Sequence, residues 1–119
     1  MAEEKPVEHR IVSRVSSDNG MVTSYSSAPP YDSLTRNVSQ WVRALKPPCF
    51  VMVERETYAD GSFMLIGRMY PGSGSFFYKQ MGNSPQDQRD CSDKVMNNII
   101  TAIKAIKDEK RREDEGEKE

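Results

Sequence analysis

The sequence predicts an α+β protein, a two-layer sandwich in which two helices pack on one face of an antiparallel sheet, in the order β-β-α-β-β-β-α. Two dipeptides typical of β-hairpin turns, Asn-Gly at 19–20 and Asp-Gly at 60–61, each separate two β-prone runs. Two other stretches, 31–45 and 84–107, repeat apolar residues at helical spacing. Because an antiparallel sheet can leave one face in water, we expect both helices on the same side.

Three strands in series, at 49–57, 62–70 and 75–81, form the centre of the predicted sheet. The first joint, Asp-Gly at 60–61, favours a two-residue turn in which both central residues have positive φ. The second joint, Pro-Gly-Ser-Gly at 71–74, also has turn composition. The three strands therefore form a meander.

A more polar hairpin precedes them, with strands at 9–17 and 21–25 around Asp-Asn-Gly at 18–20. Ser13 and Arg14 interrupt the apolar alternation of its first strand. We therefore expect both of its strands to be edge strands of the sheet.

The first helix follows a loop at 26–30. Its apolar face is predicted to consist of Tyr31, Leu34, Val38, Trp41, Val42 and Leu45. Asp32 or Ser33 could cap its start, and the prolines at 47–48 cannot continue it.

The second helix is predicted to begin at Ser84, with proline in its first turn and Asp87 three residues after the cap; Ser92 is an alternative cap. Its predicted apolar face consists of Cys91, Val95, Ile99, Ala102 and Ile106. From Lys107 onward the chain is charged, and Gly116 is expected to break the helix.

Length and composition predict one domain with polar ends: a flexible lead at 1–8, a single α+β domain at 9–107 and a charged tail at 108–119. The chain has 119 residues, of which 36% are apolar and 29% charged, as in a small folded protein. A net charge of −1 argues against a surface that binds nucleic acid all over, because phosphate affinity comes from Lys and Arg.

The same sequence predicts an intracellular, cytoplasmic protein without a membrane partner. It contains no run of about 18 apolar residues. Its first residues are charged where a signal peptide would be apolar. Cys49 and Cys91 lie on apolar faces, so we expect buried thiols in a reducing compartment.

An enzyme is not expected. The single histidine, His9, lies in a polar stretch without a cysteine or acid at a motif spacing. Glu54 and Glu56 share one face of a strand, and Val51 and Val53 take the other, so the two acids are expected to face solvent. No acid–base pair follows from this arrangement.

No metal site, cofactor or small-molecule substrate is predicted. One histidine and two distant cysteines cannot build a zinc shell. The Gly-Ser-Gly loop at 72–74 lacks the lysine and helix start of a phosphate-binding loop, so we interpret it as a hairpin turn.

Basic and aromatic residues alternate through the strands and the second helix. Aromatic rings on a sheet can stack single-stranded bases, or they can form the core under the helices. The interleaved residues are Arg55, Phe63, Arg68, Tyr70, Phe76, Phe77, Tyr78, Lys79, Arg89 and Lys94. The candidate RNA-contact residues among them are Arg68, Lys79, Arg89 and Lys94.

The α-β-β-β-α order over 34–107, with Pro-Cys-Phe at 48–50 opening the first strand, resembles a double-stranded-RNA-binding domain. At 91–95 the sequence Cys-Ser-Asp-Lys-Val occupies the family's basic cluster, so only Lys94 matches its phosphate-binding lysines. The hairpin at 58–61 reads Tyr-Ala-Asp-Gly and lacks the family's Gly-Pro-x-His loop. The resemblance thus implies a degenerate member, a type that commonly serves in protein–protein association.

The full order of elements, with the hairpin turn at 17–20, is also similar to the roadblock and longin-like scaffolds, a similarity of topology alone. These scaffolds are dimerising adaptors in motor and trafficking complexes. The sequence therefore predicts a non-catalytic interaction module: a protein–protein adaptor or homodimer, which could pair edge strands or pack helices. The alternative is an RNA-binding protein.

Overall fold

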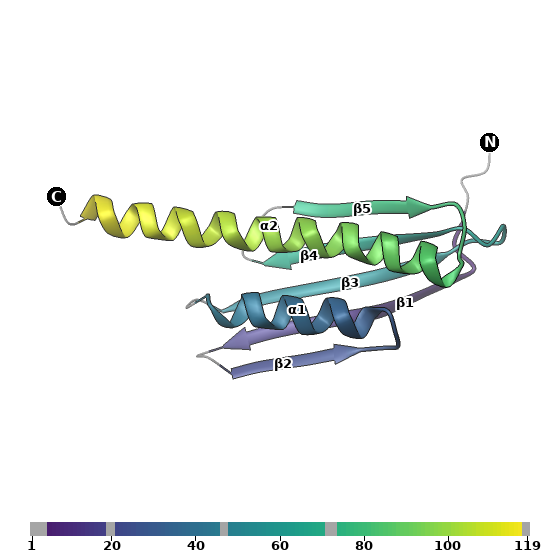
Figure 1. Ribbon diagram of the computed structural model, residues 1–119, viewed down its shortest axis with the longest axis horizontal. Coiled ribbons are helices and arrows are strands. Elements are labelled where there is room, and N and C mark those ends of the chain that lie inside the picture. Colours follow the sequence, from purple (N-terminus) through teal and green to yellow (C-terminus); the bar gives the residue numbers. More distant parts are fainter. Residues whose placement is uncertain (1–4, 19–20, 46–47, 71–73, 118–119) are drawn as a thin grey trace.

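A computed structural model describes residues 5–18, 21–45, 48–70 and 74–117, with side chains as far as Asp108. It has the predicted α+β architecture and element order, and both helices lie side by side on one face of the sheet (Figure 1). The elements are β1 (Glu8–Asp18), β2 (Met21–Ser26), α1 (Tyr31–Arg43), β3 (Cys49–Thr57), β4 (Phe63–Tyr70), β5 (Gly74–Gln80) and α2 (Pro85–Glu117).

The five strands are antiparallel in the spatial order β2-β1-β3-β4-β5. The expectation that both strands of the first hairpin are edge strands is therefore correct for β2 and wrong for β1. The chain passes through α1 and returns β3 alongside β1, so β1 has a neighbour on each side. Val12 and Val15 of β1 are consequently fully buried.

The β3–β4 turn differs in detail from the expected two-residue turn. The N–H of Gly61 donates to the carbonyl of Tyr58 (3.0 Å), so Ala59 and Asp60 are the central pair. Gly61 follows with φ +87°, the conformation that glycine adopts most readily. The Tyr58 N–H donates to the Ser62 carbonyl (2.9 Å), which makes this a three-residue hairpin loop.

Three of the predicted joints fall outside the described residues: Asn19-Gly20, Lys46-Pro47 and Pro71–Ser73. The strands on either side of the first and third joints pair in antiparallel register. These two hairpins are thus confirmed, while their turns stay predictions.

α1 begins without a side-chain cap, so the expected capping role of Asp32 or Ser33 is wrong. Its N-cap residue is Pro30, and no side chain accepts a hydrogen bond there. Asp32 lies inside the first turn, where its Oδ1 accepts from the Ser33 N–H (2.9 Å). The predicted apolar face is confirmed, with Tyr31 and Leu34 among its buried members.

α2 begins with the predicted reciprocal cap. The Ser84 Oγ accepts from the Asp87 N–H (3.1 Å), and the Asp87 Oδ2 accepts from the Ser84 N–H (3.2 Å). Ser92, the alternative cap, is buried within the helix. The helix passes Gly116, where a break was expected, and its C-terminal part projects beyond the strands (Figure 1).

The core lies between the helices and the sheet. α2 packs closely on Gly67 of β4, where a Cβ atom would lie 3.2 Å from a methyl group of Val95. A side chain at this position would therefore require Val95 to shift by a few tenths of an ångström. Fully buried core residues from the two layers are Val12, Val15, Leu34, Val38, Val42, Val51, Val53, Phe63, Leu65, Val95, Ile99 and Ile103.

Candidate interaction surface

The second face of the sheet, which we call the open face, is covered by no described helix, since α1 and α2 both pack on the other side. Residues directly opposite each other in an antiparallel sheet share a face. The register therefore assigns to the open face four rows of side chains that each cross at least four strands, and the pair Asp18–Met21 at one corner. The four rows are Thr23-Ser16-Phe50-Tyr70, Tyr25-Arg14-Met52-Arg68-Ser75, Ile11-Glu54-Ile66-Phe77 and His9-Glu56-Met64-Lys79.

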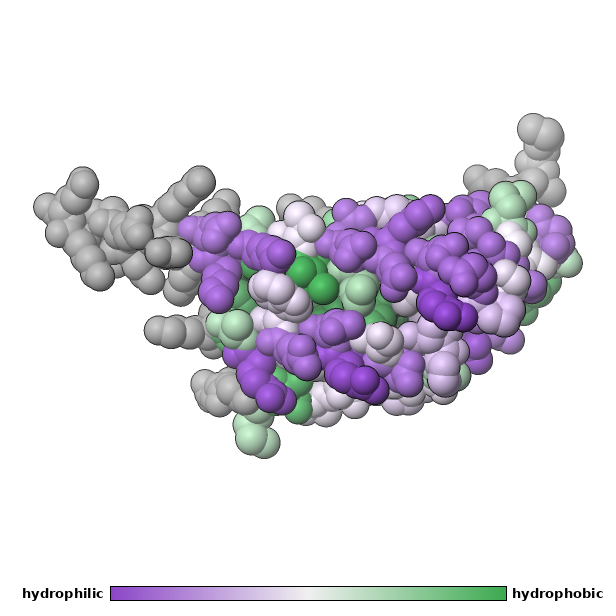
Figure 2. All heavy atoms as spheres, viewed as in Figure 1, coloured by the Kyte–Doolittle hydropathy of each residue, from purple (hydrophilic) through white to green (hydrophobic). Residues whose placement is uncertain are grey.

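Large rings are exposed on the open face. The exposed fractions are 37% for Phe50, 49% for Tyr25, 59% for Phe77 and 70% for Tyr70. Figure 2 shows the opposite, helical side, which is mostly hydrophilic apart from a narrow apolar strip between the helices. The four rings on the side without helices thus make up four of the seven large hydrophobic side chains that are exposed in the described chain.

A carboxylate lies at the middle of the open face. The Oε1 of Glu54 is 3.7 Å from the Nε2 of His9, and its Oε2 is 3.6 Å from a terminal guanidinium nitrogen of Arg68. The Glu54 side chain is only 12% exposed, because Ile11 and Ile66 flank it on the neighbouring strands. The expectation of a solvent-exposed Glu54 is therefore wrong, although its face is the predicted one.

His9 belongs to β1, in agreement with the strand predicted at 9–17. Its side chain is half-exposed. Within the described residues, its only ion-pair partner is the carboxylate of Glu54. The pair joins β1 to β3.

The four candidate RNA-contact residues do not form one surface. Arg68 and Lys79 lie on the open face, where Arg68 is paired with Glu54 and the Lys79 Nζ lies 5.0 Å from the centre of the Tyr58 ring. Arg89 and Lys94 are exposed on α2, on the other side of the sheet. Contact of any of these residues with RNA stays a prediction.

The aromatic residues of the strands were expected either in the core or exposed on the sheet, and the structure has some of each. Phe63 is fully buried, and Phe76 and Tyr78 pack partly buried against the core. Tyr70 and Phe77, in contrast, point to the open face. The period-2 alternation within each strand decides which ring lies on which side.

Arg55 is buried, although a basic residue is usually exposed. Its guanidinium donates to the Tyr31 hydroxyl (2.9 Å) and the Gln88 side-chain oxygen (3.3 Å), and it lies 4.4 Å from the centre of the Phe63 ring. Burial raises the pKa of Tyr31, although the Arg55 charge opposes that rise. Arg55 thus ties β3 to the first turns of both helices and is not available to a ligand on the open face.

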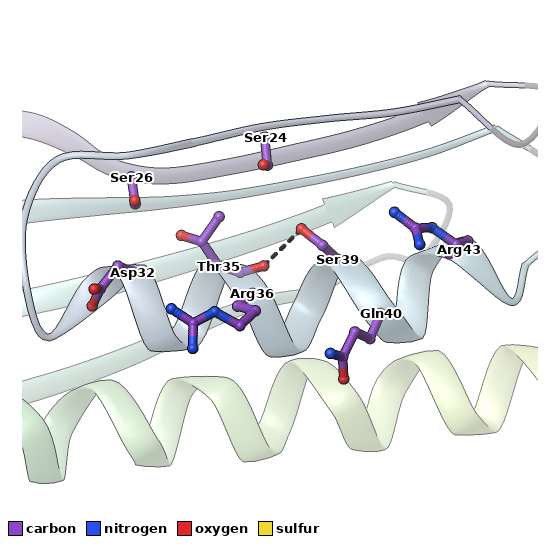
Figure 3. A pocket seen from close by; sticks show the side chains of 8 residues that line it. All are labelled: Ser24, Ser26, Asp32, Thr35, Arg36, Ser39, Gln40 and Arg43. Atoms are coloured by element: carbon purple, nitrogen blue, oxygen red, sulfur yellow. Dashed lines mark hydrogen bonds between the residues drawn. The ribbon is translucent and has the colours of Figure 1, made fainter.

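A polar groove of about 420 Å³ lies between β2 and α1 (Figure 3). Several of its hydroxyls already have partners: Thr35 donates to the Tyr31 carbonyl (2.8 Å) and Ser39 donates to the Thr35 carbonyl (2.7 Å). The lining residues are Ser24, Ser26, Asp32, Thr35, Arg36, Ser39, Gln40 and Arg43. Sequence reasoning missed this groove, for which the alternating serines of β2 were the available signal.

Both cysteines are buried free thiols, as expected. Burial raises the pKa of the Cys91 thiol to about 11 and also raises the pKa of the Cys49 thiol. Neither group is therefore a reactive thiolate at neutral pH. Within the described residues, no cluster of three or more histidine, cysteine or acidic side chains has the geometry of a metal site.

Comparisons with protein-family models, curated proteins and solved structures found no match to this chain. Over the part of the chain that the structure describes, no helix combines the length and hydropathy needed to cross a bilayer. The open face is therefore interpreted from its own residues.

Proposed function

We propose that the protein is a non-catalytic module that binds another protein through the open face. The observation that carries this proposal is the set of four exposed rings on a sheet face that the helices leave uncovered. Antiparallel sheets commonly have one face in water, but that face is then normally polar. Contiguous exposed apolar surface on a folded domain marks an interaction site.

The composition of the open face supports a protein partner. Protein–protein interfaces are enriched in Tyr, Phe, Met and Arg and depleted in Lys, Glu and Asp. The four rows of the open face contain the exposed aromatic residues together with two methionines and two arginines, and Lys79 is their only lysine. Glu54 is already neutralised by its contact with Arg68, so burying the pair would leave no isolated charge.

The size of the open face fits the same function. Across the sheet, five strands about 4.8 Å apart give a width of roughly 24 Å. Along the strands, the four rows cover about seven residues, which gives a length of roughly 23 Å. A standard protein–protein interface removes about 800 Å² of surface from each partner. The open face and its rim are therefore about the right size for one partner.

The charge distribution gives less support to the alternative, RNA binding. The first turns of α2 carry Asp87, Asp90 and Asp93 beside Arg89 and Lys94, where phosphate binding would require a basic cluster. RNA binding would instead have to use the open face. There Phe50 and Tyr70 lie directly opposite each other on adjacent strands and could stack unpaired bases.

The test is affinity capture with immobilised protein, followed by titration of the captured protein in purified form. Tyr70→Asp places a charge beside Phe50 among the exposed rings of the proposed contact and should weaken binding by at least about tenfold. Met81→Asp is the matched control, because Met81 is also 70% exposed but lies in the loop after β5. Equal binding by the two variants, or loss of binding in both, would contradict the proposal.

Titration with duplex and single-stranded RNA at two salt concentrations tests the alternative. Micromolar, salt-sensitive binding that Arg68→Ala weakens would favour RNA on the open face. Weakening by Lys94→Ala and Arg89→Ala would instead favour contact through α2. We expect no salt-sensitive binding to either RNA.

A further inference from the structure

The edge strand β5 has the features of a strand that pairs with another chain. It contains seven residues, three of them consecutive aromatics, without proline, and Lys79 is its only charge. It pairs with β4 without a register break, so no bulge disrupts the strand. No backbone hydrogen bond joins β5 to any other described strand or loop. Its outer backbone groups are therefore open to pairing, a liability that natural edges usually counter with several charges, proline or a bulge.

The residues of β5 are self-complementary across a two-fold axis. Residues opposite each other in an antiparallel pair share a face, so the register between two copies must be centred on one residue, with the axis midway between its two copies. The centre of β5 is Phe77, and a register centred there pairs every residue of the strand. Phe77 then faces Phe77 of the second copy, Phe76 faces Tyr78, Ser75 faces Lys79, and Gly74 faces Gln80. This register puts no two like charges opposite each other.

The other edge, β2, lacks this complementarity. It has six residues. With an even number, a two-fold register that pairs all of them would place residues from different faces of the sheet opposite each other, which antiparallel pairing does not allow. It also contains no pair of adjacent aromatics, and α1 packs against it with the polar groove between them. The two edges therefore differ, and β5 is the one suited to self-association.

The helix above β5 is compatible with this pairing. α2 lies over β4 and β5 (Figure 1), and its Asn98 amide donates to the Tyr78 hydroxyl. With strands about 4.8 Å apart, the two copies of α2 would lie about 10 Å from each other, which is a normal helix-packing distance. Helix contact would add to the small area buried by strand pairing alone and bring the interface closer to the size of a stable dimer.

We propose that a second copy of this chain binds at β5, with an antiparallel strand register centred on Phe77, and that the dimer has one continuous ten-stranded sheet. The open faces of the two copies would then form a single surface. This dimer uses the sheet edge and not the open face, so it goes beyond the proposed function and can fail or succeed independently of it.

The test changes the only pair of the proposed register that contains a charged residue, Ser75 with Lys79. It measures the dimer dissociation constant by sedimentation equilibrium up to about 1 mM chain. Ser75→Lys should weaken the dimer about tenfold, because a lysine then faces Lys79 of the second copy at two symmetric positions. Ser75→Glu should strengthen the dimer by a similar factor. Ser75→Lys combined with Lys79→Glu should restore the affinity of the parent.

The rescue is specific for pairing between copies. Ser75 and Lys79 of one chain are four residues apart along a strand, about 13 Å, too far for direct pairing. Thermal unfolding of each variant controls for folding, since Ser75 also lies opposite Arg68 within the chain. A monomeric mass for both the parent and Ser75→Glu at 1 mM would overturn the proposal. A dimer that ignores these substitutions, or that Tyr70→Asp dissociates, would also overturn it.

Discussion

The two faces of the sheet are made by the same strands but have different physical roles. On the covered face Val51, Val53 and Leu65 are fully excluded from water by the two helices. On the open face their sequence neighbours include exposed rings such as Phe50 and a paired carboxylate, Glu54. Burial is complete on one side because of packing within the chain. On the other side it would have to come from a partner.

The largest effect is expected from placing the same charge on each face. Ile99→Asp leaves an unpaired carboxylate between α2 and the sheet and should cost more than about 4 kcal/mol of unfolding free energy. Tyr70→Asp on the open face should cost less than about 1 kcal/mol. Urea denaturation of both variants measures the difference. Similar losses would mean that the open face is also part of the core.

The free energy of unfolding should also depend on pH through Cys91, a buried residue of the covered face. The pKa of Cys91 is raised from 9.0 to about 11 in the folded protein, so between these values the unfolded chain loses a proton that the folded chain keeps. This contribution to stability is fully present below pH 9.0 and is lost as the pH rises to about 11, a change of about 2–3 kcal/mol.

Chemical denaturation across this pH range, compared with Cys91→Ala, isolates the contribution of the thiol from that of lysines and tyrosines. The alanine variant should be less stable at neutral pH but lose less stability between pH 9.0 and about 11. Parallel pH profiles for the two proteins would show that the thiol reaches water.

A smaller effect is expected at the start of the helix that covers β4 and β5. Ser84→Ala removes the side-chain oxygen that accepts from the Asp87 N–H and should cost about 1 kcal/mol. Ser33→Ala is the matched control, because Ser33 in α1 makes no side-chain cap, and it should cost less than about 0.5 kcal/mol. Equal costs would mean that the cap of α2 does not stabilise the covering layer.

The smallest effect is expected where α2 has passed the sheet. Removal of residues 113–119 should leave the melting temperature unchanged, since the buried residues of the helix, among the side chains described as far as Asp108, lie between Cys91 and Ile103. Removal of residues 103–119 deletes Ile103 and should lower it clearly. A large drop with the shorter deletion would show that the end of the helix packs against the domain.

Local patterns predicted the elements because their causes are local. The spacing of apolar residues located both helices, and the alternation within β3 assigned Val51 and Val53 to one face and Glu54 to the other. Glycine next to a polar residue located two hairpins. The turn at Gly61 was predicted in the right place but with the wrong central pair, because one extra residue fits the same sequence signal.

Non-local pairing was not predictable from such patterns. β1 was expected at an edge because it is polar, yet β3 lies beside it and buries Val12 and Val15. Glu54 was expected in water, and Ile11 and Ile66 from two other strands cover it. Arg55 was noted only as a basic residue interleaved with aromatic ones, and its partners Tyr31 and Gln88 come from the helices.

The sequence by itself determined which segments form helices and strands and which side of each segment is apolar, since these depend on residues a few positions apart. Only the tertiary structure decided which strands became edges, which charges were buried, and that four exposed rings lie on one uncovered face. The physical reason is that strand order and burial depend on contacts between residues far apart in the chain, which no short stretch of sequence encodes.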